Sequence, residues 1–94
     1  MIKALLEASI LINLRDEEKS SYDLMLEFNN KFNVFLSPGT LYSSVNIMER
    51  DGLLKGKQKG RARVYTLTEN GEDILDKILD DTEIIQDFVQ KLLS

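Results

Sequence analysis

The 94-residue sequence contains no cysteine and no histidine. Without cysteine, the chain cannot form disulfide bonds or thiolate metal sites. Without histidine, it lacks the usual general base of nucleophilic enzymes and the usual nitrogen ligand of zinc. No apolar run approaches the roughly 20 residues that a membrane-spanning helix needs. These absences argue against an enzyme, a cofactor, a metal site and a membrane protein, and we expect the chain in the cytoplasm.

Positive charge is also in short supply, because 12 basic residues face 16 acidic ones and the net charge is −4 at pH 7. This balance argues at first against a nucleic-acid partner. Residues 52–68, however, hold five basic and no acidic side chains, whereas 1–51 carries −3 and 69–94 carries −6. At physiological salt, charges more than about 8 Å away are largely screened, so an anionic partner would respond mainly to this local positive charge.

Hydrophobic spacing predicts helices in the first half of a single domain. Apolar residues recur at helical spacing over 1–14, which predicts a core helix there. The polar stretch 15–19 is expected to be a loop. A second helix begins at Ser20-Ser21, where a serine oxygen can cap free backbone N–H groups. That helix ends within 29–33, and a very short strand is expected at 34–36.

The clearest helix start is the dipeptide Ser37-Pro38. Serine suits the N-cap, and proline suits the first helical position, where its missing N–H is not needed. This helix should run to about Asp51, with Gly52 as a left-handed stop. Thr68 can cap a last helix that continues to the end of the chain. We therefore divide the chain into 1–68 and 69–94, the second being an appended helix.

Two strands, 53–58 and 61–68, are predicted between these helices and should form a hairpin joined at Lys59-Gly60. The order helix, helix, helix, hairpin, helix predicts a fold that is mainly α with a small β-hairpin. It is the order of a winged helix-turn-helix followed by a further helix. In such a fold the third helix enters the major groove of DNA, which is about 12 Å wide.

The outward face of the third helix is mostly polar but carries little charge, which is unusual for a face that only meets water. Asn46 is suited to an adenine edge and Arg50 to guanine or phosphate, while Tyr42 and Ser43 can reach bases or backbone. The residues at the helix start, Ser37, Gly39 and Thr40, would lie near a phosphate. The alternative is that Tyr42 packs between helices and Arg50 pairs with a nearby acid.

Basic residues fall at every second position of the hairpin, namely Lys55, Lys57, Lys59, Arg61 and Arg63. A period of two places side chains on one face of a strand. Since Leu53, Tyr65 and Leu67 share the alternation, one face is expected to change from apolar at the base to cationic at the tip. Five cations without a counter-ion favour phosphate binding. The alternative is a solvated hairpin whose lysines block edge-to-edge aggregation.

The last helix has apolar residues on about two sides, more than a small core requires. Its first half is expected to cover the hairpin and the first helix. The residues further along favour a contact between two copies of the chain. The candidate dimer residues are Ile78, Ile84, Ile85, Phe88, Val89, Leu92 and Leu93.

Three segments resemble the short form of the PadR family of prokaryotic transcription regulators, and the resemblance covers roughly residues 9–75. The stretch 39–42 followed by 48–54 is similar to the family's recognition helix and first wing strand. The stretch 63–71 is similar to its second wing strand and the start of its dimerisation helix. Tyr22-Asp23-Leu24 matches the start of its second helix.

The resemblance implies a homodimer in which the last helix packs against the partner's first helix, which adds Leu5 to the dimer residues. It implies binding to an inverted repeat of double-stranded DNA, usually as a repressor. Tyr22, Thr40 and Tyr42 would then contact the DNA backbone. Lys57, Arg61 and Arg63 carry over as wing contacts. Some members bind aromatic ligands between subunits, but this chain has no tryptophan, and no effector is inferred.

Two functions remain open at this point. The first is a sequence-specific DNA-binding regulator that acts by occupying its site, without catalysis. The second is a winged-helix module that binds another protein and not DNA, which the net negative charge supports. The cationic hairpin distinguishes them, because a protein adaptor has little use for an unpaired cationic tip.

Overall fold

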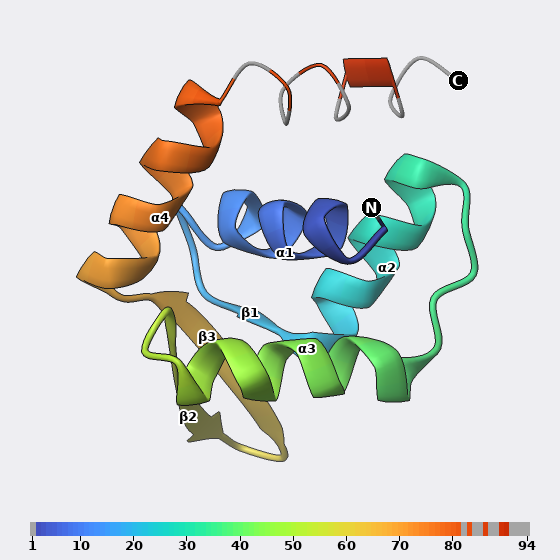
Figure 1. The fold of residues 1–94 in the computed structure, drawn as a ribbon. Coiled ribbons are helices and arrows are strands. Elements are labelled where there is room, and N and C mark those ends of the chain that lie inside the picture. Colours follow the sequence, from blue (N-terminus) through green and yellow to red (C-terminus); the bar gives the residue numbers. More distant parts are fainter. Residues whose placement is uncertain (1, 82, 84–85, 87–88, 91–94) are drawn as a thin grey trace.

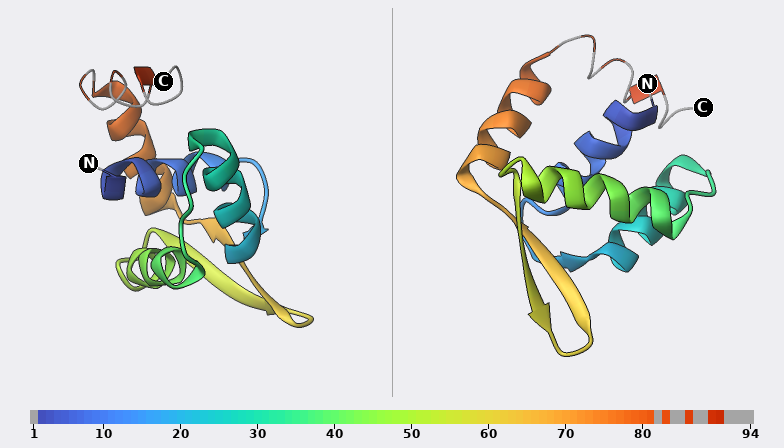
Figure 2. Two further views of the ribbon diagram at one scale, coloured as in Figure 1. Left: turned by 90° about the vertical axis from the view of Figure 1, so that its right-hand side faces the viewer. Right: turned by 60° about the horizontal axis from the view of Figure 1, so that its bottom comes forward.

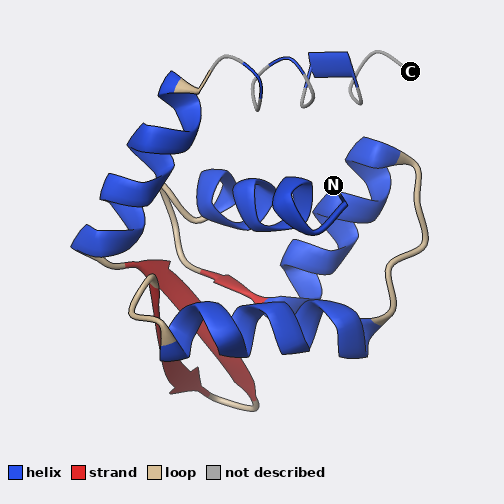
Figure 3. Ribbon diagram, in the orientation of Figure 1, coloured by secondary structure: helices blue, strands red, loops and turns tan. Residues whose placement is uncertain are grey.

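The computed structural model describes residues 2–81 together with residues 83, 86, 89 and 90. In chain order the elements are α1 (Ile2–Asn13), β1 (Lys19–Ser20), α2 (Ser21–Phe32), α3 (Pro38–Arg50), β2 (Leu54–Lys59), β3 (Ala62–Leu67) and α4 (Glu69–Asp80). Helices α1, α2 and α3 pack together, α4 lies against α1, and the β2–β3 hairpin extends from the helical body (Figures 1 and 3). The predicted fold, mainly α with a small β-hairpin, is confirmed. No helix in the described part of the chain is long and apolar enough to cross a membrane.

Local signals in the sequence set the helix boundaries. The side-chain oxygens of Ser20, Ser37 and Thr68 each accept a backbone N–H from three residues further on, as N-caps do. Pro38 occupies the first position of α3. Gly52, which follows the end of α3, has a φ of +83°, a conformation that glycine adopts without steric penalty. The predicted beginning and end of α3 are therefore confirmed.

The three strands form one antiparallel sheet in the order β1-β3-β2. β2 pairs with β3 along its whole length, and the two-residue loop Gly60-Arg61 joins them. Gly60 has a φ of +64°, which suits glycine at the first position of a tight hairpin turn. The turn lies one residue later than the predicted Lys59-Gly60.

Strand β1 lies where the sequence predicts the end of a loop and the start of a helix. It pairs with the free edge of β3 through Lys19 opposite Tyr65 and Ser20 opposite Val64. Each of these pairs joins residues more than 40 positions apart, so the local sequence does not predict the strand. The strand brings the loop before α2 to the side of the hairpin.

The short strand expected at 34–36 is not formed, and this segment has no regular secondary structure. Its backbone is satisfied in another way, because the N–H of Leu36 donates to the side-chain oxygen of Asn29 at 2.9 Å. Phe35 is 94% exposed, so the segment's apolar residues are not all drawn into the core.

One hydrophobic core joins all four helices and the hairpin. Its buried members are Leu6, Ile10, Leu11, Leu14, Leu24, Met25, Phe28, Leu41, Val45, Met48, Leu54, Tyr65 and Leu75. Leu75 comes from α4, and Ile74, Ile78 and Leu79 pack against the cluster from the same helix. The first half of the last helix thus covers the core, as expected.

The two faces of the hairpin differ from the prediction. Leu54 and Tyr65 are 2% and 0% exposed and point into the core, whereas Leu53 is only half-buried and precedes β2. Because side chains alternate along a strand, the position of Leu54 assigns the lysines of β2 to the opposite face. The expected single face that changes from apolar to cationic is therefore wrong for β2.

Helix α4 ends at Asp80, so the prediction of one uninterrupted helix over 69–94 is wrong. Asp81 is extended, with φ −87° and ψ 111°. Its backbone N–H donates to the carbonyl of Ile78 at 3.1 Å, and its carboxylate accepts the N–H of Glu83 at 3.0 Å. Asp81 therefore closes α4 and caps helical residues that follow, a role that short acidic side chains favour.

Candidate nucleic-acid interface

Helix α3 presents an uncharged face to solvent. Leu41, Val45 and Met48 are buried, which turns Tyr42, Ser43 and Asn46 outward. The outward residues and the start of the helix line a shallow apolar hollow formed by Pro38, Gly39, Tyr42, Ser43 and Asn46. Tyr42 is 48% exposed and does not take the alternative position between helices. The face predicted to read bases is therefore open to a partner.

The last turn of α3 carries its only charges, Glu49 and Arg50. The guanidinium Nε of Arg50 lies 3.8 Å from a carboxylate oxygen of Asp51, the acid pairing that was the alternative for this residue. The Arg50 side chain is nevertheless 75% exposed, so a phosphate or a base edge can still reach it.

The starts of α2 and α3 supply the remaining predicted contacts on the helices. Tyr22, in the first turn of α2, is 62% exposed. The hydroxyl of Ser37 accepts the N–H of Thr40 at 3.2 Å and lies 2.8 Å from the Thr40 hydroxyl. No heavy atom lies within 4 Å of the place where a side chain on Gly39 would begin. The first turn of α3 is thus capped but unobstructed.

The lysines of β2 lie on the outer face of the hairpin, which projects beyond the helices (Figure 2). The ammonium nitrogens of Lys57 and Lys59 lie 3.5 Å and 2.5 Å from the two carboxylate oxygens of Glu18, just before β1. The hydrogen bond from Lys59 holds the pKa of Glu18 below its ordinary value, and Lys57 adds to this effect. The carboxylate of Glu18 thus pairs with two lysines of the β2–β3 hairpin, which is the wing of this fold.

Arg63 lies on the other face of the hairpin, beside the core. Its guanidinium donates to Glu49 at 2.7 Å and lies 5.7 Å from the centre of the Tyr65 ring. The same Glu49 oxygen accepts the backbone N–H of Gly56 at 3.3 Å. The Arg63 side chain crosses so close to Gly56 that a β-carbon there would lie 2.8 Å from it. This contact links α3 to both strands of the wing.

The expectation of five cations without a counter-ion is therefore wrong for three of them. Lys57 and Lys59 pair with Glu18, and Arg63 pairs with Glu49. None of the ion pairs in the described part of the chain involves Lys55 or Arg61. Sequence reasoning missed both acids because each is distant along the chain from its cation.

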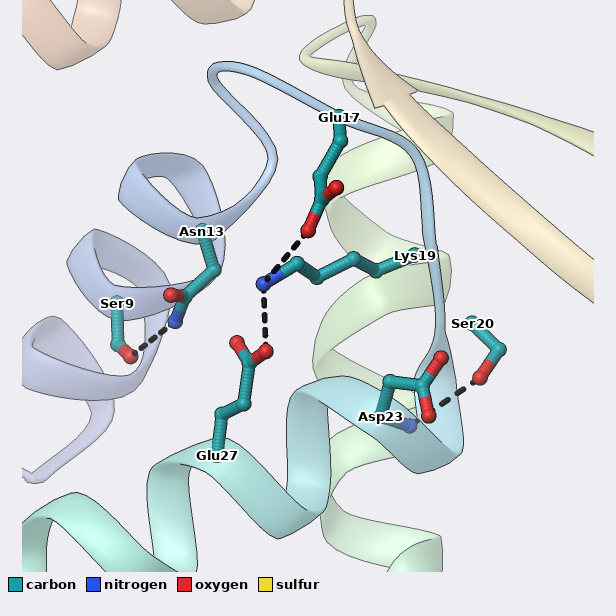
Figure 4. Close-up of polar contacts among 7 residues, drawn as sticks. All are labelled: Ser9, Asn13, Glu17, Lys19, Ser20, Asp23 and Glu27. Carbon is teal, nitrogen blue, oxygen red and sulfur yellow. Dashed lines mark hydrogen bonds and ion pairs between the residues drawn. The ribbon is translucent and has the colours of Figure 1, made fainter.

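A second polar cluster fixes β1 between the wing and α2 (Figure 4). The ammonium of Lys19 lies 2.5 Å from Glu27 of α2 and 3.6 Å from Glu17, and its side chain is only 15% exposed. The hydrogen bond to Glu27 raises the pKa of Lys19. Because Lys19 turns toward α2 and the next residue, Ser20, caps that helix, the position of Glu18 is well defined.

Comparison with known proteins decides the family. The model of the transcriptional regulator PadR-like family matches residues 10–77, which is most of the chain. The protein belongs to the PadR-like family of transcriptional regulators. The fold agrees, because solved PadR-family structures share the arrangement of helices and wing described above.

A PadR-like transcriptional regulator from Bacillus cereus is 26% identical, with a TM-score of 0.82 over 100% of this chain and 96% of the other. A PadR-like transcription factor from Bacteroides fragilis is 23% identical, with a TM-score of 0.77 over 96% and 91%. Bacillus subtilis PadR, solved in complex with operator DNA, is 25% identical, with a TM-score of 0.66 over 79% of this chain and 45% of the other. No curated protein sequence matches the chain.

The predicted PadR-type dimer residues are only partly within the described structure. Leu5 is 6% exposed and offers little surface to a partner, whereas Ile78 is half-buried and Val89 is 44% exposed. The remaining candidates, Ile84, Ile85, Phe88, Leu92 and Leu93, lie outside the described residues. The dimer contact stays a prediction.

Proposed function

We propose that this PadR-like regulator binds double-stranded DNA sequence-specifically, as a homodimer on an inverted repeat, and represses transcription. The observation that supports this most strongly is the exposed, uncharged face of α3 beside a projecting cationic hairpin. DNA recognition needs both, since base edges carry sequence and phosphates provide position. The protein acts by occupying its site in the cytoplasm, without a catalytic step.

In this proposal α3 lies in the major groove. Asn46 pairs with an adenine edge, and Ser43 and Tyr42 contact bases or backbone beside the hollow. Arg50 reaches a guanine or a phosphate. The capped start of α3, from Ser37 through Gly39 and Thr40, faces a phosphate, as helix N-termini commonly do, and Tyr22 contacts the backbone next to it.

The wing grips the flanking phosphates. Lys55 and Arg61 have no carboxylate partner in the described part of the chain and engage phosphate directly. Arg61 lies in the turn and can enter a minor groove. Lys57, Lys59 and Arg63 are also proposed contacts, but each must first exchange a carboxylate of its own chain for a phosphate.

Dimerisation is proposed through residues 69–94 packing on the partner's α1, with 1–68 as the DNA-binding unit and 69–94 as the dimerising unit. Two α3 helices would then address half-sites about one helical turn, or ~34 Å, apart. Bacillus subtilis PadR, solved with operator DNA, supports a DNA-binding role for a relative of this chain.

A gel shift with DNA from the protein's own upstream region tests this function. The assay is run at about 50 and about 200 mM salt with an excess of random competitor duplex, because phosphate contacts weaken steeply with salt. A discrete band that survives the competitor and weakens at higher salt supports a sequence-specific regulator. No band on any duplex at low salt contradicts DNA binding and favours the protein-binding module instead.

A further inference from the structure

Glu18 holds two wing lysines in the way that a phosphate would. Its two carboxylate oxygens lie 3.5 Å and 2.5 Å from the ammonium groups of Lys57 and Lys59. The two lysines are 64% and 65% exposed, whereas the Glu18 side chain is 28% exposed. An anion bound between two cations that are otherwise open to solvent is the arrangement in which one DNA phosphate would be gripped.

The backbone of β1, which is held on both sides, places Glu18 beside the wing. The next two residues pair with the edge of β3, and Lys19 is also fixed to Glu27 of α2 at 2.5 Å. Alternation along β1 then puts Glu18 on the face opposite Lys19, which is the outer face that bears the lysines. The hydrogen bond from Lys59 lowers the pKa of Glu18, so this carboxylate stays charged to a lower pH than an ordinary glutamate does.

We propose that Glu18 is an intramolecular competitor of the DNA phosphate and sets the affinity of the wing for DNA. This inference rests on the proposed DNA-binding function. Duplex can use Lys57 and Lys59 only by displacing the carboxylate, which is then left near a phosphate of the same charge. Phosphates carry no sequence information, so Glu18 weakens binding to operator and random duplex alike.

Glu18→Gln tests the proposal, with Glu17→Gln as the matched control. Glu17 is adjacent, loses the same charge in its variant, and contacts Lys19, not the wing lysines. Binding is measured by fluorescence anisotropy on an operator-region duplex and a random duplex between about 50 and about 300 mM salt. We expect Glu18→Gln to bind both duplexes about tenfold more tightly at the low salt and about twofold at the high salt.

The slope of log affinity against log salt concentration should also steepen by about one for Glu18→Gln, because no freed carboxylate takes up a cation on binding. Glu17→Gln should change the affinity by less than about twofold, since the Glu17 carboxylate pairs with Lys19 and the wing lysines pair with Glu18. Equal effects of the two variants, or weaker binding by Glu18→Gln, overturn the proposal.

A double-mutant cycle shows whether Glu18→Gln changes the affinity for DNA through Lys57 and Lys59. In a Lys57→Gln, Lys59→Gln background, Glu18→Gln should no longer increase affinity, and a surviving increase contradicts competition at these lysines. If neither the parent nor Glu18→Gln binds any duplex at low salt, the proposed function fails and this inference fails with it. If the parent binds and the two Gln variants behave alike, only this inference fails.

Discussion

Helix α3 and the wing hairpin meet at the same surface but are built in opposite ways. The exposed face of α3 is uncharged from Pro38 to Ile47, and buried apolar side chains on its other face hold it in place. The outer face of the hairpin is charged, and two of its lysines are paired with an acid of the same chain. The helix is thus positioned by the core and exposed to solvent, whereas the charge of the wing is partly neutralised by a carboxylate of the same chain.

The largest effect should come from removing the support of α3. Leu41 is 1% exposed, and Leu41→Ala should lower the free energy of unfolding by about 2–5 kcal/mol through lost burial and a residual cavity. Urea denaturation measures this change. Ser43→Ala on the opposite face is the control and should stay within about 0.5 kcal/mol. A small loss for Leu41→Ala would mean that α3 is not held by the core.

Asn46→Ala tests the recognition of bases without changing the packing of α3 against the core. The side chain is exposed, so stability should be unchanged, while binding to the operator should weaken by about 1–3 kcal/mol. The salt slope should stay the same, because no phosphate contact is lost. Competition assays on duplexes with single base changes measure the preference. An equal loss on operator and random duplex would show that Asn46 does not read bases.

Substitutions in the wing are expected to change the salt dependence of binding and not the preference for a sequence, the reverse of Asn46→Ala. Lys55→Ala combined with Arg61→Ala should weaken binding to all sequences and reduce the salt slope by about two, one for each phosphate contact. Anisotropy titrations at several salt concentrations measure both quantities. Lys31→Ala combined with Lys77→Ala removes the same charge from α2 and α4 and is the control. Equal slopes for the two double variants would exclude the wing from the DNA contact.

The smallest effect concerns pH and the ion pairs of Glu18. The pKa of Glu18 is lowered in the folded protein, first by the hydrogen bond from Lys59. Its contribution to stability is therefore complete above the unfolded value of 4.5 and is lost as pH falls through the lower folded value. We expect Glu18→Gln to lower Tm by at most about 2 °C at pH 7. This difference should shrink as pH falls below 4.5 and vanish once the pH is below the lowered folded pKa. A difference that persists in acid would contradict this assignment.

Much of the fold could be predicted because its signals are local. Ser37, Pro38 and Gly52 define α3, and the alternating cations define a hairpin. The assignment of the hairpin's faces failed because Leu53 and Leu54 are both apolar, so either could begin the core-facing row. Only the packing of Leu54 against the helices decides between them.

The candidate site was less predictable, because its electrostatics are tertiary. Glu18 meets Lys59, 41 residues away, and Glu49 meets Arg63, 14 residues away. Composition could show that the hairpin is basic, but it could not show which acids approach it. The break at Asp81 was readable in principle, since a short acidic side chain before a further helical stretch is an N-cap signal.

Strand β1 has only two residues, yet charge determines which face of the sheet each of its side chains takes. If it slipped by one position along β3, Glu18 would turn to the inner face, toward Glu27, and Lys19 would turn outward, into the row of Val64 and Lys57. Glu18 would then face another carboxylate, and Lys19 would face another ammonium group. A strand too short to be specified by hydrophobic alternation is therefore protected from a one-residue slip by the repulsion that this slip would create.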